Sequence, residues 1–304
     1  MPVNLSAIRD LLLPGLRGVA GQYDQIPSRW DKVFSKGKSN MALERTASMR
    51  YLGLAQLKNE GGQTRFDNGA GERYIYNQEH REIALGYAIT RKAIDDNLYK
   101  TQFNPSNLGL LRSFAQTKEI YAFNVLNNGT TYDSSIGGDG KALFATDHPI
   151  DGGTFANKPS VDVDLNESTL LNAMTTIPTT FVDNAGLKVF ARARKLVVPN
   201  ALEPVAIRLT KTELRPGTAD NDVNAILSTS GGLPDGYTVS EFLTSNYAWF
   251  LLTNIEGLLY LERVPFETDM QVEFTTDNLL VKGYERYSFS YNDPRAAYGS
   301  FPTA

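Results

Sequence analysis

His148 is the residue best placed to do chemistry, because it directly follows the carboxylate of Asp147. A histidine beside a carboxylate could act as the general base of a hydrolase. Side chains of adjacent residues usually diverge, however, and no serine stands in the Gly-x-Ser-x-Gly turn that presents a hydrolase nucleophile. We therefore expect His148 to bond locally and stabilise its loop. A cytoplasmic hydrolase that uses Asp147 and His148 stays as the alternative from another functional class.

A glycine-rich segment before His148 is the nearest approach to a phosphate-binding loop. It reads G-G-D-G-K-A over residues 137–142. The P-loop pattern needs its first glycine where this chain has Ser135, and a serine or threonine after the lysine, where it has Ala142. We interpret the segment as a flexible turn and expect no nucleotide cofactor.

Metal-binding patterns are equally incomplete. Asp162 and Asp164 begin like a calcium loop, but Glu167 stands where such a loop needs glycine and Ala173 where it needs a bidentate glutamate. The chain has no cysteine, which excludes disulfides, thiolate nucleophiles and cysteine zinc sites. The sequence therefore predicts no metal site, no cofactor and no catalytic residue.

Composition and charge indicate a globular protein with a basic beginning and an acidic body. The 304 residues are 41% hydrophobic and 21% charged, which is ordinary for a folded domain. Residues 1–60 carry nine Lys/Arg and five Asp/Glu, whereas the remaining 244 residues carry 21 and 29. Such a body is too acidic to coat DNA through phosphate contacts, so a DNA partner would be enclosed and not read. No leader and no stretch of 18 apolar residues is visible, so we expect no membrane partner.

The first 95 residues predict two extended elements that could reach neighbouring molecules. Residues 1–40 are expected to form a basic arm and residues 41–95 a long β-hairpin. Alternation over residues 82–89 marks the returning strand, and apolar residues at 51–54 mark the outgoing one. The long charged loop between them is typical of a segment that lies on a neighbour. The candidate inter-subunit contacts are Lys32, Lys36, Lys38, Lys58, Arg65, Phe66 and Arg73.

The rest of the chain mixes helices and strands. A long helix is predicted over residues 105–127, with Asn104 as its cap and Pro105 in its first turn. Its wide apolar face implies packing along much of its length. Alternation at residues 270–274 and 287–291 predicts antiparallel strands with one buried face. The predicted class is α+β, with mixed sheets and one dominant helix.

Six stretches, taken in order, resemble the major head proteins of tailed bacteriophages, especially the Mu-like head subunits. The segment from Gly140 to Pro149, reading GKALFATDHP, looks like a Leu-Phe, small residue, His-Pro segment of that family. The other stretches that carry the resemblance are Arg91–Asn97, Leu196–Glu203, Asn221–Ile226, Asn246–Leu252 and Asp293–Ser300.

This resemblance implies a Hong Kong 97-type capsid fold. The arm would be residues 1–40, the extended loop 41–95, the peripheral domain 96–160 and 263–304 with its spine helix at 105–127, and the axial domain 161–262. Subunits of such families form hexamers and pentamers that tile an icosahedral shell around double-stranded DNA. The protein would then be a virion component assembled in the host bacterial cytoplasm. A bacterial nanocompartment shell, which shares the fold but holds enzymes, is the nearest rival.

The short segment before the extended loop also bears on partners. Only about 40 residues precede that loop, too few for a fused scaffolding coiled coil. The resemblance therefore implies either a separate scaffolding protein or an arm that does that work. It also implies a portal, with a decoration protein as a further candidate partner.

Overall fold

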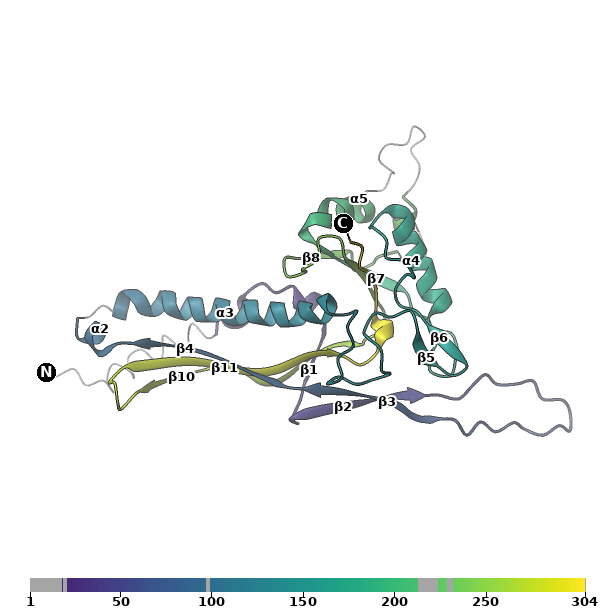
Figure 1. Ribbon diagram of the computed structural model, residues 1–304, viewed down its shortest axis with the longest axis horizontal. Helices are drawn as coiled ribbons and strands as arrows, with labels where there is room; N and C mark the ends of the chain where they lie inside the picture. Colours follow the sequence, from purple (N-terminus) through teal and green to yellow (C-terminus); the bar gives the residue numbers. More distant parts are fainter. Residues whose placement is uncertain (1–17, 19–20, 97–98, 213–223, 229–231, 304) are drawn as a thin grey trace, which may run out of the picture.

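The protein consists of a long limb, a compact block at one end of it and a projecting hairpin (Figure 1). The computed structural model describes residues 18, 21–96, 99–212, 224–228 and 232–303. The predicted stretch at residues 221–226 therefore lies partly outside the described residues, as does most of the first half of the predicted arm. No helix in the described part of the chain is long and apolar enough to cross a membrane. Helices and sheets are mixed, which confirms the predicted α+β class.

The limb is a four-stranded sheet in the order β1–β10–β11–β4, covered on one face by helix α3 (Figure 1). The strand β1 runs parallel to β10, and the other pairs are antiparallel. Gly283 brings the helix close to the sheet, because a Cβ there would stand only 2.8 Å from the ring of Phe114. The elements of the limb are β1 (Ser35–Lys38), β4 (Arg81–Ile89), α3 (Tyr99–Asn127), β10 (Leu258–Val272) and β11 (Leu279–Tyr291).

The block is built on a second mixed sheet in the order β12–β9–β7–β8. Its centre is apolar, with Leu196, Trp249 and Leu251 fully buried against side chains of α4 and α5. A capping box between Asn166 and Thr169 begins α4 and satisfies its first free backbone N–H groups. The elements are α4 (Glu167–Thr180), β7 (Ala193–Pro199), α5 (Glu203–Lys211), α6 (Ala225–Ser228), β8 (Tyr237–Ser240), β9 (Trp249–Thr253) and β12 (Ala297–Ser300).

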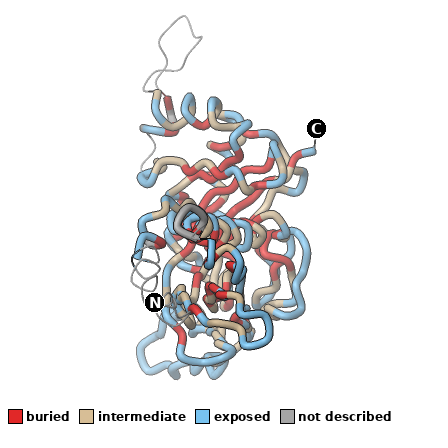
Figure 2. The backbone as a smooth tube through the Cα atoms, turned by 90° about the vertical axis from the view of Figure 1, so that its left-hand side faces the viewer, coloured by how far each residue is buried: buried red, intermediate tan, exposed pale blue. Residues whose placement is uncertain are grey.

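The hairpin of β2 (Leu43–Arg50) and β3 (Gly71–Glu79) projects beyond the block (Figure 1). Residues 51–70 between the two strands contain no helix or strand. Figure 2 shows the buried residues concentrated along the inner strands and the exposed residues on the outer loops. The smaller elements are η1 (Tyr23–Gln25), η2 (Trp30–Lys32), α2 (Arg91–Asp95), β5 (His148–Ile150), β6 (Gly153–Phe155), η3 (Asn200–Leu202) and η4 (Pro294–Ala296).

The predicted strands of the hairpin were assigned to the wrong partners. The alternating strand at residues 82–89 is β4, which pairs with β11 in the limb, and the returning strand of the hairpin is β3. The outgoing strand is β2, which ends at Arg50, so residues 51–54 are not a strand. Alternation reports a strand with one buried face, and β4 has that face because it lies beneath α3. It does not say which strand lies beside it.

The predicted spine helix begins earlier than expected. Helix α3 starts at Tyr99, so Pro105 lies inside it and not in its first turn. A proline has no N–H to donate to the carbonyl four residues earlier, so α3 lacks one backbone hydrogen bond at Pro105. Residues 263–304 were expected to belong wholly to the peripheral domain. Instead, β11 lies in the limb, whereas β12 pairs with β9 of the block.

Candidate inter-subunit surfaces and their anchors

The tip of the hairpin carries exposed apolar side chains. Leu54, Leu57 and Phe66 are 79%, 103% and 83% exposed, and Tyr51 and Leu52 are more than half exposed. Lys58 and Arg65 lie on the same exposed loop, as the sequence predicted. A soluble protein rarely leaves so many large apolar groups in water unless another surface covers them. The tip therefore has the chemistry of a protein contact surface.

An aspartate on the block fixes the base of this hairpin. Arg50 at the end of β2 and Arg73 in β3 both bind the Asp151 carboxylate, which lies in the turn between β5 and β6. Arg73 also donates to the Asn184 carbonyl oxygen at 2.7 Å. The Arg73 guanidinium, predicted as an inter-subunit contact, is thus engaged within its own chain.

Asn184 adds a second anchor beside Asp151. Its buried side-chain amide donates to Ser48 Oγ at 2.6 Å and to the Met49 carbonyl at 2.9 Å, both in β2. Arg295 in turn donates to Asn184 Oδ1 at 3.1 Å. The hairpin therefore leaves the block in a direction set by charged and amide contacts on both of its strands.

The Asp151 clamp gives a prediction about pH. Hydrogen bonding from Arg50 is the largest cause that holds the pKa of the Asp151 carboxyl below its ordinary value. A carboxyl with a depressed folded pKa stabilises the fold above its unfolded pKa of about 3.9, and that contribution is lost as pH falls through the folded pKa. We expect the Asp151 carboxyl resonance to titrate below pH 3.9 in the unassembled subunit, and to move upward in Arg50→Gln. An unchanged midpoint in Arg50→Gln would contradict the clamp.

The described part of the predicted arm packs on the limb and is not a free strand. Lys36 and Lys38 lie in β1 at the edge of the limb sheet, and Lys32 ends η2; all three side chains are exposed. The Lys36 ammonium stands 4.8 Å from the centre of the Trp30 ring. Lysines on an edge strand also hinder unwanted strand pairing, so their exposure alone does not identify a contact.

Two adjacent charges on α3 hold this arm segment in place. The Glu119 carboxylate accepts hydrogen bonds from the backbone N–H groups of Arg29 at 2.5 Å and Trp30 at 3.2 Å. Burial raises the pKa of the Glu119 carboxyl. Lys118 lies 2.8 Å from the Glu285 carboxylate of β11, which also accepts from the Tyr23 hydroxyl at 3.1 Å.

The Lys118–Glu285 pair is buried within aromatic rings. Lys118 Nζ lies 4.9–6.0 Å from four ring centres, and both charged side chains are less than a tenth exposed. Burial raises the pKa of the Glu285 carboxyl, while Lys118 and the Tyr23 hydroxyl oppose that rise. The rings belong to Tyr23, Trp30, Tyr260 and Tyr287. Sequence reasoning missed this cluster, although a lysine at a stripe position of an apolar helix face was a visible signal.

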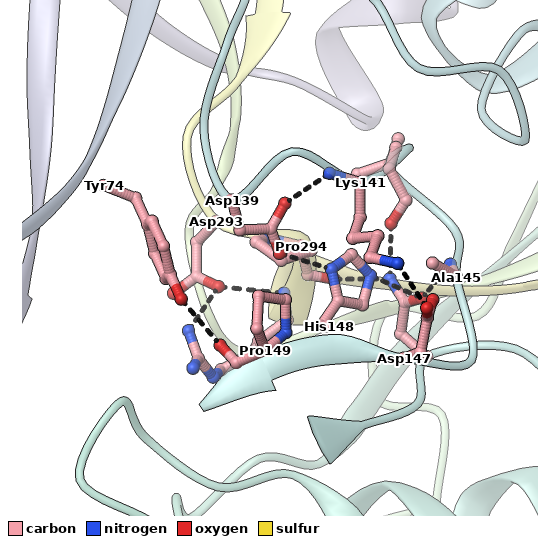
Figure 3. Close-up of polar contacts among 12 residues, drawn as sticks. Tyr74, Asp139, Lys141, Ala145, Asp147, His148, Pro149, Asp293 and Pro294 are labelled. Carbon is pink, nitrogen blue, oxygen red and sulfur yellow. Dashed lines mark hydrogen bonds and ion pairs between the residues drawn. The ribbon is translucent and has the colours of Figure 1, made fainter. Parts of the chain in front are cut away.

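His148 has a structural environment (Figure 3). It is buried, with Nδ1 2.6 Å from Asp139 Oδ2 and Nε2 3.2 Å from Asn157 Oδ1. Asp147 instead pairs with Lys141, so the two residues of the hydrolase alternative turn to different partners. Among the described residues, no group of three or more His, Asp and Glu side chains could hold a metal ion.

Asn157 is the centre of this network, and replacing it should cost stability. Its amide donates to the carbonyls of Leu143 at 2.6 Å and Pro294 at 2.9 Å, and its Oδ1 accepts from the Ala145 N–H at 2.9 Å. Asn157→Ala leaves these buried groups unpaired, so the free energy of unfolding should fall by about 3 kcal/mol in urea denaturation. Asn172→Ala, at an exposed position of α4, is the control and should change it by less than about 0.5 kcal/mol. Equal losses in both variants would refute the role of Asn157.

A comparison with protein-family models identifies the family of this chain. The model described as "Phage capsid protein" matches residues 81–300, which is more than half of the chain. The chain belongs to the phage capsid protein family. It is therefore a structural component of a phage virion, and the predicted relationship to tailed-phage head proteins is confirmed at this level. The finer assignment to the Mu-like head subunits stays a prediction. A comparison with curated proteins found no match.

Solved structures share the capsid fold across most of the chain. The virus-like particle from Pyrococcus furiosus matches with a TM-score of 0.55 at 9% identity, over 95% of this chain and 98% of that one. Microbacterium phage Oxtober96 matches with a TM-score of 0.55 at 12% identity, over 91% of each chain. The mature capsid of bacteriophage PhiM1 matches with a TM-score of 0.55 at 10% identity, over 90% and 86%. These likenesses confirm the predicted Hong Kong 97-type fold.

Proposed function

We propose that this chain is the major capsid protein of a tailed phage, which assembles as hexamers and pentamers into an icosahedral head. The family match over residues 81–300 is the observation that carries the proposal. The solved relatives named above include a mature phage capsid, and the hairpin of this chain exposes the apolar surface that such an assembly needs. The head would enclose double-stranded DNA without reading its sequence, since the body of the chain is acidic.

The parts of the fold take on roles within this proposal. The limb, formed by α3 and the sheet of β1, β10, β11 and β4, would be the peripheral domain, and the block, built on β7, β8, β9 and β12, would be the axial domain. The β2–β3 hairpin would be the extended loop, and residues 1–40 the arm. A separate scaffolding protein, a portal and a decoration protein are the partners that such a shell would use.

No enzymatic step is part of the proposed function. The alternative hydrolase would need His148 as a base, but His148 is buried between Asp139 and Asn157, and Asp147 is bonded to Lys141. If the chain were a hydrolase, His148→Ala would remove an activity from a small oligomer. A nanocompartment shell would share the fold, but the family match favours a phage head.

Electron microscopy of the purified protein tests the proposal. We expect shells, tubes or sheets of hexamers and pentamers when the chain is expressed alone or with neighbouring head proteins. Shells that contain DNA after co-expression with a portal and packaging motor would support a phage head, whereas docked enzymes would indicate a nanocompartment. Discrete small oligomers under both conditions would overturn the proposal.

A further inference from the structure

The hairpin has a neck where its two strands end and the long loop begins. Asp67 closes this neck, because its carboxylate accepts from the Gly53 N–H at 2.8 Å on the outgoing side and from the Gly69 N–H at 2.9 Å on the returning side. Arg50 lies 3.5 Å from the same carboxylate. The next residue, Asn68, is exposed and belongs to no helix or strand. It is therefore held in place only by the side chains around it.

Asn68 precedes a glycine, and that pair of residues can react with itself. The Gly69 nitrogen attacks the side-chain carbonyl carbon of Asn68 when the backbone turns to bring them together, and glycine has no Cβ to hinder that turn. The N–Cγ bond forms, the Cγ–Nδ2 bond breaks, and ammonia leaves with the proton of the Gly69 N–H. Water then opens the five-membered imide at either carbonyl and gives aspartate or isoaspartate.

The backbone at Asn68 is free to make this turn. Neither Asn68 nor Gly69 takes part in a strand ladder or a helix, and both are exposed. The Gly69 N–H donates to the Asp67 side chain and not to a backbone carbonyl, so water can replace its acceptor when the residue turns. Exposed loop segments with few backbone hydrogen bonds open locally at little cost in free energy.

The chain contains a second Asn-Gly pair, Asn128 and Gly129, which serves as an internal comparison. Asn128 is also exposed, but it directly follows α3 and its N–H donates to the Asn124 carbonyl at 3.0 Å. The Gly129 N–H donates to the Leu126 carbonyl at 3.0 Å, and the Gly129 carbonyl accepts from the Phe144 N–H at 2.8 Å. Cyclisation here would break these backbone bonds, so it requires local unfolding of the end of the helix.

We propose that Asn68 is a self-modification site, at which the folded subunit converts asparagine to aspartate or isoaspartate without an enzyme. The conversion adds one negative charge beside Asp67. Isoaspartate also inserts one carbon into the backbone before the Gly69 nitrogen, so Asp67 can no longer hold Gly53 and Gly69 in the same geometry, and the neck loosens. The chemistry belongs to a single subunit, and it does not depend on whether copies assemble into a shell.

Peptide mapping of the full-length, unassembled subunit tests this proposal. Trypsin releases Asn68 in the peptide 66–73 and Asn128 in the peptide 119–141. During incubation at neutral to mildly alkaline pH, we expect peptide 66–73 to gain about 1 Da and to resolve into an aspartate and an isoaspartate form. This gain should be about 10-fold faster than any gain in peptide 119–141, because Gly129 must first break its backbone bonds. Equal rates in the two peptides, or an unmodified peptide 66–73, would overturn the proposal.

Two controls show whether the fold sets this difference. In concentrated urea both Asn-Gly pairs lose their backbone constraints, so their rates should become similar. If peptide 119–141 stayed unmodified there, its protection would not come from the end of α3, and the structural argument would fail. The variant Asn68→Gln should abolish the gain in peptide 66–73, because its longer side chain cannot close the five-membered imide. A gain that persists in Asn68→Gln would place the modification at another residue and would refute the role of Asn68.

Discussion

Lys118→Met is expected to lower the free energy of unfolding by about 3–5 kcal/mol, because it leaves the Glu285 carboxylate buried without its cation. Glu285 is 1% exposed, so water cannot replace the lost ammonium. The loss should appear as a lower urea midpoint of the unassembled subunit, with little change of slope. The arm segment around Tyr23 should also exchange its backbone amides faster, because its hydroxyl is bonded to the same carboxylate.

The direction in which pH changes the stability deficit of Lys118→Met follows from the pKa of the Glu285 carboxyl. Burial raises the pKa of this carboxyl in the folded protein, and the loss of Lys118 removes the main opposing effect. A carboxyl with a raised folded pKa keeps its proton when the unfolded chain has released it. Stability is therefore lost as pH rises from the unfolded pKa of about 4.3 towards the folded value. We expect the deficit of Lys118→Met to be smaller at pH 4 than at pH 7.

Two controls separate the buried pair from general effects of removing a lysine. Lys282→Met removes an exposed lysine that pairs with an exposed Asp269 at 3.7 Å, and should change stability by less than about 1 kcal/mol. The double variant Lys118→Met with Glu285→Leu should recover most of the loss, since apolar replacement of a whole buried pair is often neutral. A deficit in the double variant as large as in Lys118→Met would mean that packing, not charge, is responsible.

Local patterns predicted the elements of the fold better than their partners. The alternation at 287–291 identified the end of β11, and the wide apolar stripes identified α3. The strand at 82–89 was found but given to the hairpin, because alternation carries no information about a partner almost 200 residues away. The true hairpin strands are mostly half-exposed and polar, so they leave a faint periodic signal.

Some residues of the candidate surfaces could be predicted from local composition, and others could not. The exposure of Lys58, Arg65 and Phe66 could be predicted from composition, because their loop is rich in glycine and charge, while their contact with a neighbour stays a prediction. The Arg73 clamp could not be predicted, because its partner Asp151 looks like any polar turn residue until the fold brings them together. The Lys118–Glu285 pair joins residues far apart in the chain, and only the three-dimensional packing of α3 on β11 brings them into contact.

Removing residues 59–70 should abolish shell assembly while leaving the subunit folded. The deletion joins residue 58 to Gly71, and the remaining loop still connects Arg50 to Gly71, which face each other in the hairpin. No residue of the four buried hydrophobic clusters in the described part of the chain lies in the deleted segment, so urea denaturation should be unchanged. The loss removes Arg65 and the exposed Phe66 from the surface that we expect to bind a neighbour.

A matched variant distinguishes the length of the loop from its side chains. Replacing residues 59–70 by a Gly-Ser segment of the same length keeps the reach of the hairpin but removes Arg65 and Phe66, while Leu54 and Leu57 stay. If side-chain contacts hold the shell together, this variant should fail to assemble as completely as the deletion, as judged by electron microscopy and sedimentation. Normal shells from both variants would exclude residues 59–70 as a structural tie. Assembly of the Gly-Ser variant alone would mean that the loop acts through its reach, and that Arg65 and Phe66 are dispensable.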